Sequence, residues 1–222
     1  MMKKYSIVAL GLILLGFFSC KKETGDPINM GFDFFPLEQS NYSIYQVDSI
    51  VWDDFNATLD TFHSEVKLLV DSAFIDNEGN PSYRWKKYVA TDTMPFTFVA
   101  NYTITKTNQN LETVEENMRY TKLIFPVIAG ASWDYNAKNT GNAKSSQYSD
   151  VDYSTTILNH TYDSCALATY EEEVNLIQEF VHYAIYARNV GMVYSKEVHK
   201  QKLSTGLSGY SVIYQLKEYG KN

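Results

Sequence analysis

From Phe34 onward the chain is a succession of short aromatic and β-branched runs separated by turn-forming residues. Tyrosine is abundant, with 18 copies, and such residues favour the pleated, half-buried surface of a strand. The clearest pair of runs, residues 65–75 and 82–90, flanks the turn-forming segment 76–80 and predicts a β-hairpin. No alternation of strands with helices is present. We therefore predict an all-β globular domain over residues 34–222, a single antiparallel β-sheet curled into a sandwich or partial barrel.

The same reading predicts most of the other elements. Further strands are expected at residues 41–52, 96–106, 117–128, 153–170 and 210–216. The polar segment 136–150 has few apolar anchors and predicts a long loop. Residues 170–188 allow two interpretations, because Val174, Ile177, Val181 and Ile185 recur at helical spacing. We favour a strand over residues 179–188, facing a further strand at 193–199, and leave the helix open.

The first 19 residues have the layout of a bacterial export signal. Lys3 and Lys4 precede an apolar stretch from Tyr5 to Phe18, which is too short to span a bilayer. The small residue Ser19 then precedes Cys20, as in a lipoprotein signal peptide. We predict that residues 1–19 are removed, that Cys20 is lipidated with acyl chains such as palmitate, and that residues 20–33 form a flexible tether. An ordinary cleaved signal peptide and an uncleaved anchor are the alternatives.

The net charge of the chain excludes one class of binding partner. Without residues 1–19 the chain keeps 17 basic and 26 acidic side chains, a formal charge of −9. No basic cluster is present, so nucleic acid is not expected as a partner. Membrane contact is expected through the lipid on Cys20, because stable anchoring takes more than one acyl chain. The predicted location is the cell envelope, lipid-anchored in the outer membrane, on either its periplasmic or its surface face.

No catalytic or cofactor motif is recognisable. With Cys20 acylated, Cys165 is the one cysteine left, and we interpret it as a buried, inert thiol on a strand. Asp53, Asp54 and Asp60 lack the glycine that a calcium loop needs, so solvated carboxylates are the preferred interpretation. No metal, cofactor or catalytic residue is therefore predicted.

Three segments carry a resemblance to a known group of proteins. They are the opening Phe34–Leu37 with Asn41–Tyr45, the central Glu116–Pro126 with Gly130 and Trp133, and Tyr186–Tyr194. In this order they resemble uncharacterised envelope lipoproteins of Bacteroidota-type bacteria over most of residues 34–216. The chain departs from them at Ser40 and Ser43, where glycine and tryptophan are usual. The resemblance implies an all-β exported lipoprotein and no particular reaction.

Exposed aromatic residues are the best candidates for binding. Tyr83, Trp85 and Tyr88 alternate imperfectly along one predicted strand. A sheet face rich in tyrosine and tryptophan stacks on sugar rings or holds a partner chain. A tyrosine-rich sheet core is nevertheless the preferred interpretation of these side chains, and a binding face is the alternative.

A second pattern concerns modification. Ser49, Ser72 and Thr93 each follow an aspartate and precede an apolar residue, as in the acceptor of Bacteroidota-type O-glycosylation. We expect these three residues to carry glycans.

The sequence as a whole favours a non-enzymatic binding module that recognises an envelope protein or a glycan. A structural or assembly component of an envelope complex is a second possibility, and a hydrolase acting on envelope or dietary polymers is a third. Two converging carboxylates in a pocket would favour the hydrolase. An exposed aromatic patch would favour binding.

Overall fold

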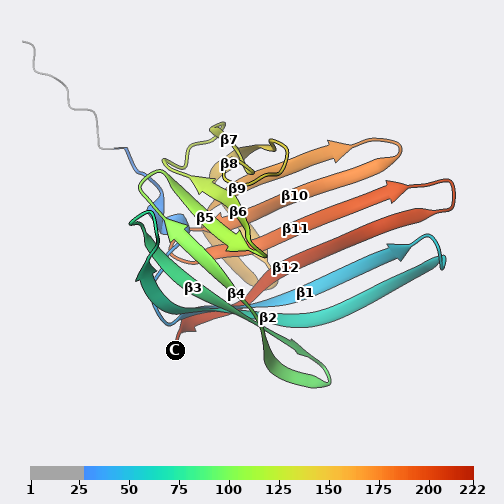
Figure 1. The fold of residues 1–222 in the computed structure, drawn as a ribbon, viewed down its shortest axis with the longest axis horizontal. Coiled ribbons are helices and arrows are strands. Elements are labelled where there is room, and N and C mark those ends of the chain that lie inside the picture. Colours follow the sequence, from blue (N-terminus) through green and yellow to red (C-terminus); the bar gives the residue numbers. More distant parts are fainter. Residues whose placement is uncertain (1–27) are drawn as a thin grey trace, which may run out of the picture.

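Twelve antiparallel strands and one short 3-10 helix form the regular structure of residues 28–222, which the computed structural model describes. The elements up to the middle of the chain are η2 (Phe32–Phe34), β1 (Asn41–Asp53), β2 (Thr58–Ile75), β3 (Pro81–Thr91), β4 (Met94–Lys106), β5 (Asn110–Glu115) and β6 (Met118–Ile124). The others are β7 (Ser132–Asp134), β8 (Ser145–Ile157), β9 (His160–Val174), β10 (Gln178–Ala187), β11 (Gly191–Lys202) and β12 (Leu207–Lys221). The predicted all-β fold class is confirmed (Figure 1).

All twelve strands belong to one sheet, in the order β6-β5-β4-β3-β2-β1-β12-β11-β10-β9-β8-β7. Neighbours in space are neighbours in sequence everywhere except at the centre, where β1 pairs with β12. The sheet therefore consists of two meanders, β1–β6 and β7–β12, which meet along the β1–β12 seam. The hairpin predicted over residues 65–90 is confirmed as β2 and β3, with Val66 opposite Val89 and Ile75 opposite Pro81.

The two edge strands, β6 and β7, come together and nearly close the sheet. The backbone amide of Thr121 donates to the carbonyl of Tyr135 at 3.0 Å, and the Trp133 indole donates to the carbonyl of Thr121 at 2.9 Å. The Tyr148 hydroxyl donates to the carbonyl of Ile124 at 2.7 Å. Because side chains supply part of this link, the edges touch without forming a full ladder. Of the two predicted forms, a sandwich and a partial barrel, the sheet thus adopts the partial barrel.

We call the part of the sheet where β6 and β7 meet the closed end. Its core is rich in tyrosine. Tyr45, Tyr148 and Tyr170 are among its largest fully buried side chains, together with Phe34 and Ile104. Two clusters of buried residues fill the inside, and Trp85 and Met192 pack against both. Burial of aromatic side chains of this size supplies a large part of the hydrophobic stabilisation.

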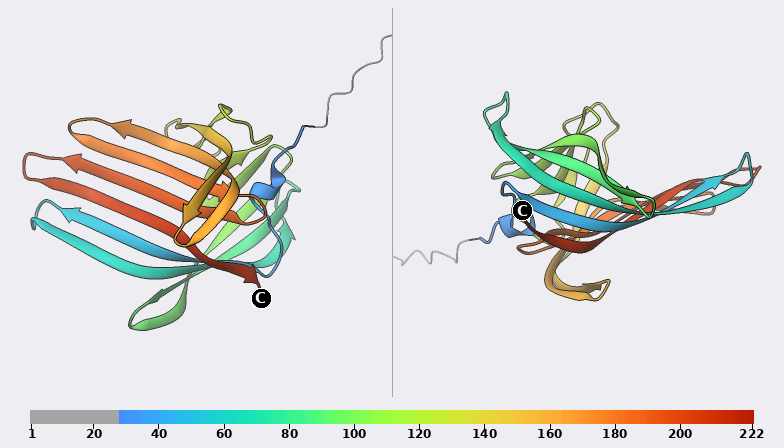
Figure 2. Two further views of the ribbon diagram at one scale, coloured as in Figure 1. Left: turned by 180° about the vertical axis from the view of Figure 1, so that it is seen from behind. Right: turned by 90° about the horizontal axis from the view of Figure 1, so that it is seen from below.

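Six strands continue past the closed end as an open sheet (Figures 1 and 2). We call this part the extension; it comprises the portions of β1, β2, β9, β10, β11 and β12 nearest the turns 54–57, 175–177 and 203–206. Its side chains are far more exposed, and Phe55 and Leu176 in two of these turns are 92% and 95% accessible. The described N-terminal residues lie at the opposite end of the molecule (Figure 1).

The ambiguous segment is extended rather than helical. Residues 171–174 end β9 and residues 178–187 form β10, so the strand expected over 179–188 is confirmed and the helix alternative is wrong. Val174 and Ile177 flank the turn between these strands and are exposed. Two of the four apolar side chains at helical spacing are therefore exposed, whereas Ile185 packs against one of the buried clusters.

Two predicted boundaries need correction. The loop expected over residues 136–150 ends at 144, because Ser145–Asp150 begins β8. Ser146 and Tyr148 on this polar strand are buried, and the Tyr148 ring lies 4.8 Å from that of Trp133. The strand expected over 117–128 ends at Ile124, shortly before Pro126, whose nitrogen has no hydrogen to donate.

Residues 30–34 pack against the closed end of the sheet. Gly31 adopts φ +74°, and an added Cβ would lie 2.8 Å from the Cβ of Val127. The Arg188 guanidinium donates to Asp33 at 2.7 Å and lies 4.2 Å from the centre of the Phe34 ring. These contacts fix where the chain enters the domain. The predicted signal peptide, Cys20 and the tether up to residue 27 lie outside the described residues.

Candidate functional site

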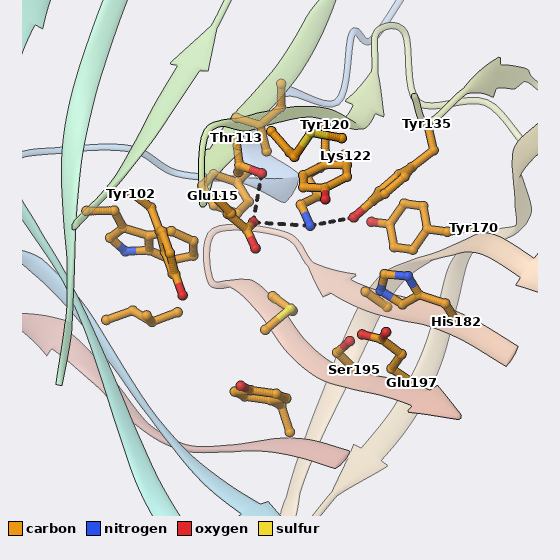
Figure 3. Close-up of a pocket in the computed structure, with 18 of the residues that line it drawn as sticks. Tyr102, Thr113, Glu115, Tyr120, Lys122, Tyr135, Tyr170, His182, Ser195 and Glu197 are labelled. Carbon is orange, nitrogen blue, oxygen red and sulfur yellow. Dashed lines mark hydrogen bonds and ion pairs between the residues drawn. The ribbon is translucent and has the colours of Figure 1, made fainter. Parts of the chain in front are cut away.

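A cavity of about 460 Å³ occupies the inside of the closed end (Figure 3). Strands β2–β6 and β9–β12 contribute to its wall, together with Phe35 and the segment after β7. Six of the lining residues are tyrosines: Tyr102, Tyr120, Tyr135, Tyr170, Tyr186 and Tyr214. The aliphatic lining is smaller, so the cavity is mainly aromatic with hydroxyl groups at the ring ends.

An ion pair forms the polar centre of this cavity. The Lys122 ammonium lies 3.2 Å from the Glu115 carboxylate and donates a 2.7 Å hydrogen bond to the Tyr135 hydroxyl. It also lies about 5 Å from the ring centres of Tyr120 and Tyr135. Burial alone would lower the pKa of Lys122, but Tyr135 and Glu115 outweigh it and raise that pKa. Both members of the pair are therefore charged.

Alternation along β6 places Lys122 in the cavity. Met118, Tyr120 and Lys122 all line it, at the two-residue spacing of side chains on one face of a strand. Lys122 is also the extra residue of a β-bulge, because Leu111 pairs with Leu123 and Glu112 pairs with Thr121. The Lys122 side chain points inward near Tyr120 (Figure 3).

A neutral histidine lies beside this ion pair. The His182 ring packs 4.7 Å from that of Tyr170 and 5.7 Å from that of Tyr135. Burial, together with the charges of Lys122 and Lys144, lowers the pKa of His182 to about 3. At neutral pH the imidazole is uncharged, so it offers one hydrogen-bond donor and one acceptor.

Several polar groups of the wall are free to bind a ligand. Tyr170 and Tyr186 satisfy each other through a 2.8 Å bond between their hydroxyls. Among the described residues, neither the hydroxyls of Tyr120 and Tyr214 nor the His182 ring has a hydrogen-bond partner. The wall thus combines aromatic rings with polar groups that remain available.

The structure separates the three aromatic residues that were proposed as one binding face. Trp85 lines the cavity, and Tyr83 lies opposite the fully buried Ile104, on the same side of the sheet. Tyr88 lies on the other side, where its ring is 5.9 Å from that of Phe98. Trp85 is therefore the member of this set that belongs to the candidate site.

The proposed acceptors of O-glycosylation lie at three separate places. Ser49 and Ser72 are half-buried on β1 and β2, and Thr93 is exposed in the turn between β3 and β4. Their modification stays a prediction.

The other residues considered from sequence have local roles. Cys165 is fully buried on β9, and burial raises the pKa of its thiol to about 11, which fits the expected inert role. Asp53 accepts hydrogen bonds from backbone amides of its own turn, and Asp54 accepts one from Thr205. Within residues 28–222, no three acidic, histidine or cysteine side chains gather as a metal site.

Sequence reasoning missed Lys122, Glu115 and His182. Lys122 follows Met118 and Tyr120 at two-residue spacing within the strand predicted over 117–128, so its side of the sheet could have been read, but its contact with Glu115 depends on the neighbouring strand. Glu115 alternates with Thr113 and Leu111 along β5, so its inward direction could have been read had residues 110–115 been recognised as a strand.

Comparison with known proteins finds similar structures but no matching family model or curated sequence. No protein-family model and no curated protein matches the chain. A Bacteroides fragilis structure, described as an exported protein with a YmcC-like fold, is 13% identical, with a TM-score of 0.46 over 83% of this chain and 99% of that one. A Parabacteroides distasonis structure, described as a lipoprotein, is 15% identical, with a TM-score of 0.42 over 86% of this chain and 100% of that one. In residues 28–222 no helix has the length and apolar character to cross a bilayer.

Proposed function

We propose that this protein is a lipid-anchored envelope protein that binds a neutral carbohydrate in the cavity of its partial barrel. The observation that carries this proposal is the wall of the 460 Å³ cavity, where six tyrosines and Trp85 surround a neutral histidine and a closed ion pair. Sugars present apolar ring faces and hydroxyls, and aromatic rings with free polar groups complement both.

The charges of the cavity favour a neutral ligand. Lys122 is balanced by Glu115, and Lys144 is balanced by Glu171 at 2.8 Å. The two other charged lining residues, Lys87 and Glu197, are one of each sign. An acyl chain would fit a wall of aliphatic side chains, whereas this wall carries hydroxyls and an imidazole that need polar partners. A sugar satisfies these groups, and a lipid tail would bury them unpaired.

The hydrolase alternative is disfavoured by the contacts of the two carboxylates that line the cavity, Glu115 and Glu197. Lys122 and the Thr113 hydroxyl, at 3.2 Å and 2.8 Å, hold Glu115. The Tyr210 hydroxyl donates to Glu197 at 2.7 Å. Because both carboxylates are already engaged by protein groups, binding without bond cleavage is the better fit.

The location rests on the sequence. A cleaved leader and an acylated Cys20 would place the domain in the cell envelope, with the outer membrane as the proposed site. The test is labelling of the native host with a palmitate analogue. A Cys20→Ala variant should lose the label, and equal labelling of variant and wild type would contradict the anchor.

Carbohydrate binding is tested by calorimetric titration with size-fractionated neutral oligosaccharides from the host envelope. Tyr214→Phe removes one free hydroxyl from the cavity and should weaken binding by about fivefold, in line with about 1 kcal/mol for one hydrogen bond. Tyr194→Phe is the matched control, because Tyr194 lines no part of the cavity. Absence of heat with every fraction would refute the proposal, as would native mass spectrometry that finds a fatty acid in the purified domain.

A further inference from the structure

A second cavity, of about 440 Å³, lies next to the point where the chain enters the sheet. Its wall includes residues 35–38, the first residues of β1, the turn before β11 and the end of β12. The second cavity is therefore lined by the residues that directly follow η2 (Phe32–Phe34).

The two cavities meet at a shared partition. Four residues line both of them: Phe35, Leu68, Trp85 and Met192. The rings of Phe35 and Trp85 lie 6.1 Å apart, edge to face. Of these four residues, Trp85 and Met192 are only half-buried. Side-chain rotation is fast compared with backbone rearrangement, so such a partition can open without unfolding the sheet.

We infer that the ligand is a neutral oligosaccharide chain that runs through both cavities, past Trp85 and Met192. This inference rests on the proposed function, because it extends the same site. Trp85 supplies the aromatic face on which a sugar at the midpoint stacks. Met192 is the flexible member of the partition, since an unbranched thioether repacks readily.

The chemistry of the second cavity fits the same ligand. Tyr42, Tyr45 and Tyr219 supply aromatic rings, and Asn41 and Asn189 supply amides. The one acidic and one basic lining residue, Glu38 and Lys221, form a 3.1 Å ion pair with each other. This cavity too is therefore aromatic, polar and balanced in charge, which suits a second stretch of uncharged sugar.

The test compares ligand lengths on the full chain. Monosaccharides, disaccharides and longer fractions of the same neutral envelope polysaccharide are titrated into the wild-type protein. Short fractions fill the first cavity. Fractions long enough to pass Trp85 should bind at least about tenfold more tightly, equivalent to about 1.4 kcal/mol.

A blocking variant isolates the second cavity. Ser43 lines this cavity but not the first, so Ser43→Phe fills the second cavity and leaves the first one unchanged. It should bind short fractions as the wild type does and lose the tenfold gain with long ones. Ser49→Phe, on the same strand and outside both cavities, is the matched control and should keep the gain.

The outcomes separate this inference from the proposed function. If short and long fractions bind with equal affinity, and Ser43→Phe does not change this, the inference that one oligosaccharide occupies both cavities is overturned. Carbohydrate binding in the first cavity would remain. Failure of every fraction to bind would overturn both. Thermal unfolding of Ser43→Phe and Ser49→Phe shows whether each is folded. If Ser43→Phe is unfolded, loss of the length gain in Met192→Trp, which bulks the partition itself, replaces it.

Discussion

The closed end and the extension are built from the same strands but use their side chains in opposite ways. On β9, Tyr170 is fully buried in the closed end, whereas Val174, four residues further along, is 64% exposed in the extension. The extension also carries the exposed Phe55, Leu59 and Leu176. Composition alone does not distinguish the two regions. Burial follows from where the sheet curls over its own face, and the cavity exists only there.

Polar groups also differ between the closed end and the outer surface. Among residues 28–222, no buried side-chain nitrogen or oxygen lacks a hydrogen-bond partner. Polar atoms inside the closed end are thus satisfied by one another or face the cavity. On the outer surface, ion pairs such as Lys217 with Glu65 lie partly in solvent, where each contributes about 0–1 kcal/mol. Substitutions in the two regions should therefore differ in size.

The largest contrast is expected between two leucines. Leu111 on β5 is fully buried, and Leu111→Ala should lower the free energy of unfolding by about 2–5 kcal/mol through lost burial and a cavity. Leu59 in the extension is 60% exposed, and Leu59→Ala should change the same quantity by less than about 0.5 kcal/mol. Urea unfolding measures both. Similar losses would show that the extension contributes to the core.

The next contrast concerns two ion pairs. Glu115→Gln leaves the Lys122 ammonium enclosed with only the Tyr135 hydroxyl, and should cost about 2–3 kcal/mol of folding free energy. Glu65→Gln removes the partner of Lys217 on the outer surface and should cost less than about 1 kcal/mol. Denaturant midpoints at neutral pH compare them. A neutral effect of Glu115→Gln would mean that water reaches Lys122.

The pH dependence of stability should isolate His182. Its pKa is about 3 in the folded protein and near 6.5 when unfolded, so below about pH 6.5 the unfolded chain binds the extra proton. Stability should then fall with decreasing pH by up to about 1.4 kcal/mol per unit from this residue, down to about pH 3. His182→Phe should have a shallower slope between pH 6 and pH 4 in urea titrations. Identical slopes for wild type and His182→Phe would mean that His182 is charged in the folded protein as well.

The last prediction concerns an aromatic stack in the extension. The rings of Phe180, His199 and Tyr210 stack across three strands, with centres 4.0 Å and 5.9 Å apart. Such contacts contribute about 0.5–1.5 kcal/mol each. Phe180→Ala should therefore cost no more than about 1.5 kcal/mol and leave calorimetric sugar binding unchanged. A lost binding signal would mean that the ligand also reaches the extension.

Much of the fold was accessible from sequence because turn chemistry and two-residue periodicity are local. The hairpin at residues 65–90 combines both signals and was correct. The start of β8 was missed because Ser145–Asp150 is polar, and one tyrosine, Tyr148, holds it in the core through long-range contacts. The pairing of β1 with β12 joins residues far apart in the chain and leaves no local signal.

The candidate site was less accessible, because it is assembled from separate strands. Alternation puts Lys122 on the same face as Tyr120, but alternation along one strand does not show that Glu115 on β5 and Tyr170 on β9 line the same cavity. Trp85 was proposed for binding and lines the cavity, but the proposal grouped it with Tyr88. Odd and even positions point to opposite faces, so alternation already separates these two side chains.

The seam between the first and last strands dictates an order of assembly. Each meander can pair its own strands while the polypeptide is still emerging, since every hairpin within it is short-range. The central join must wait until Leu207–Lys221 is available, and until then β1 presents an unpaired edge. A newly made chain therefore spends its last interval before completion as two half-sheets that need protection from pairing with other molecules.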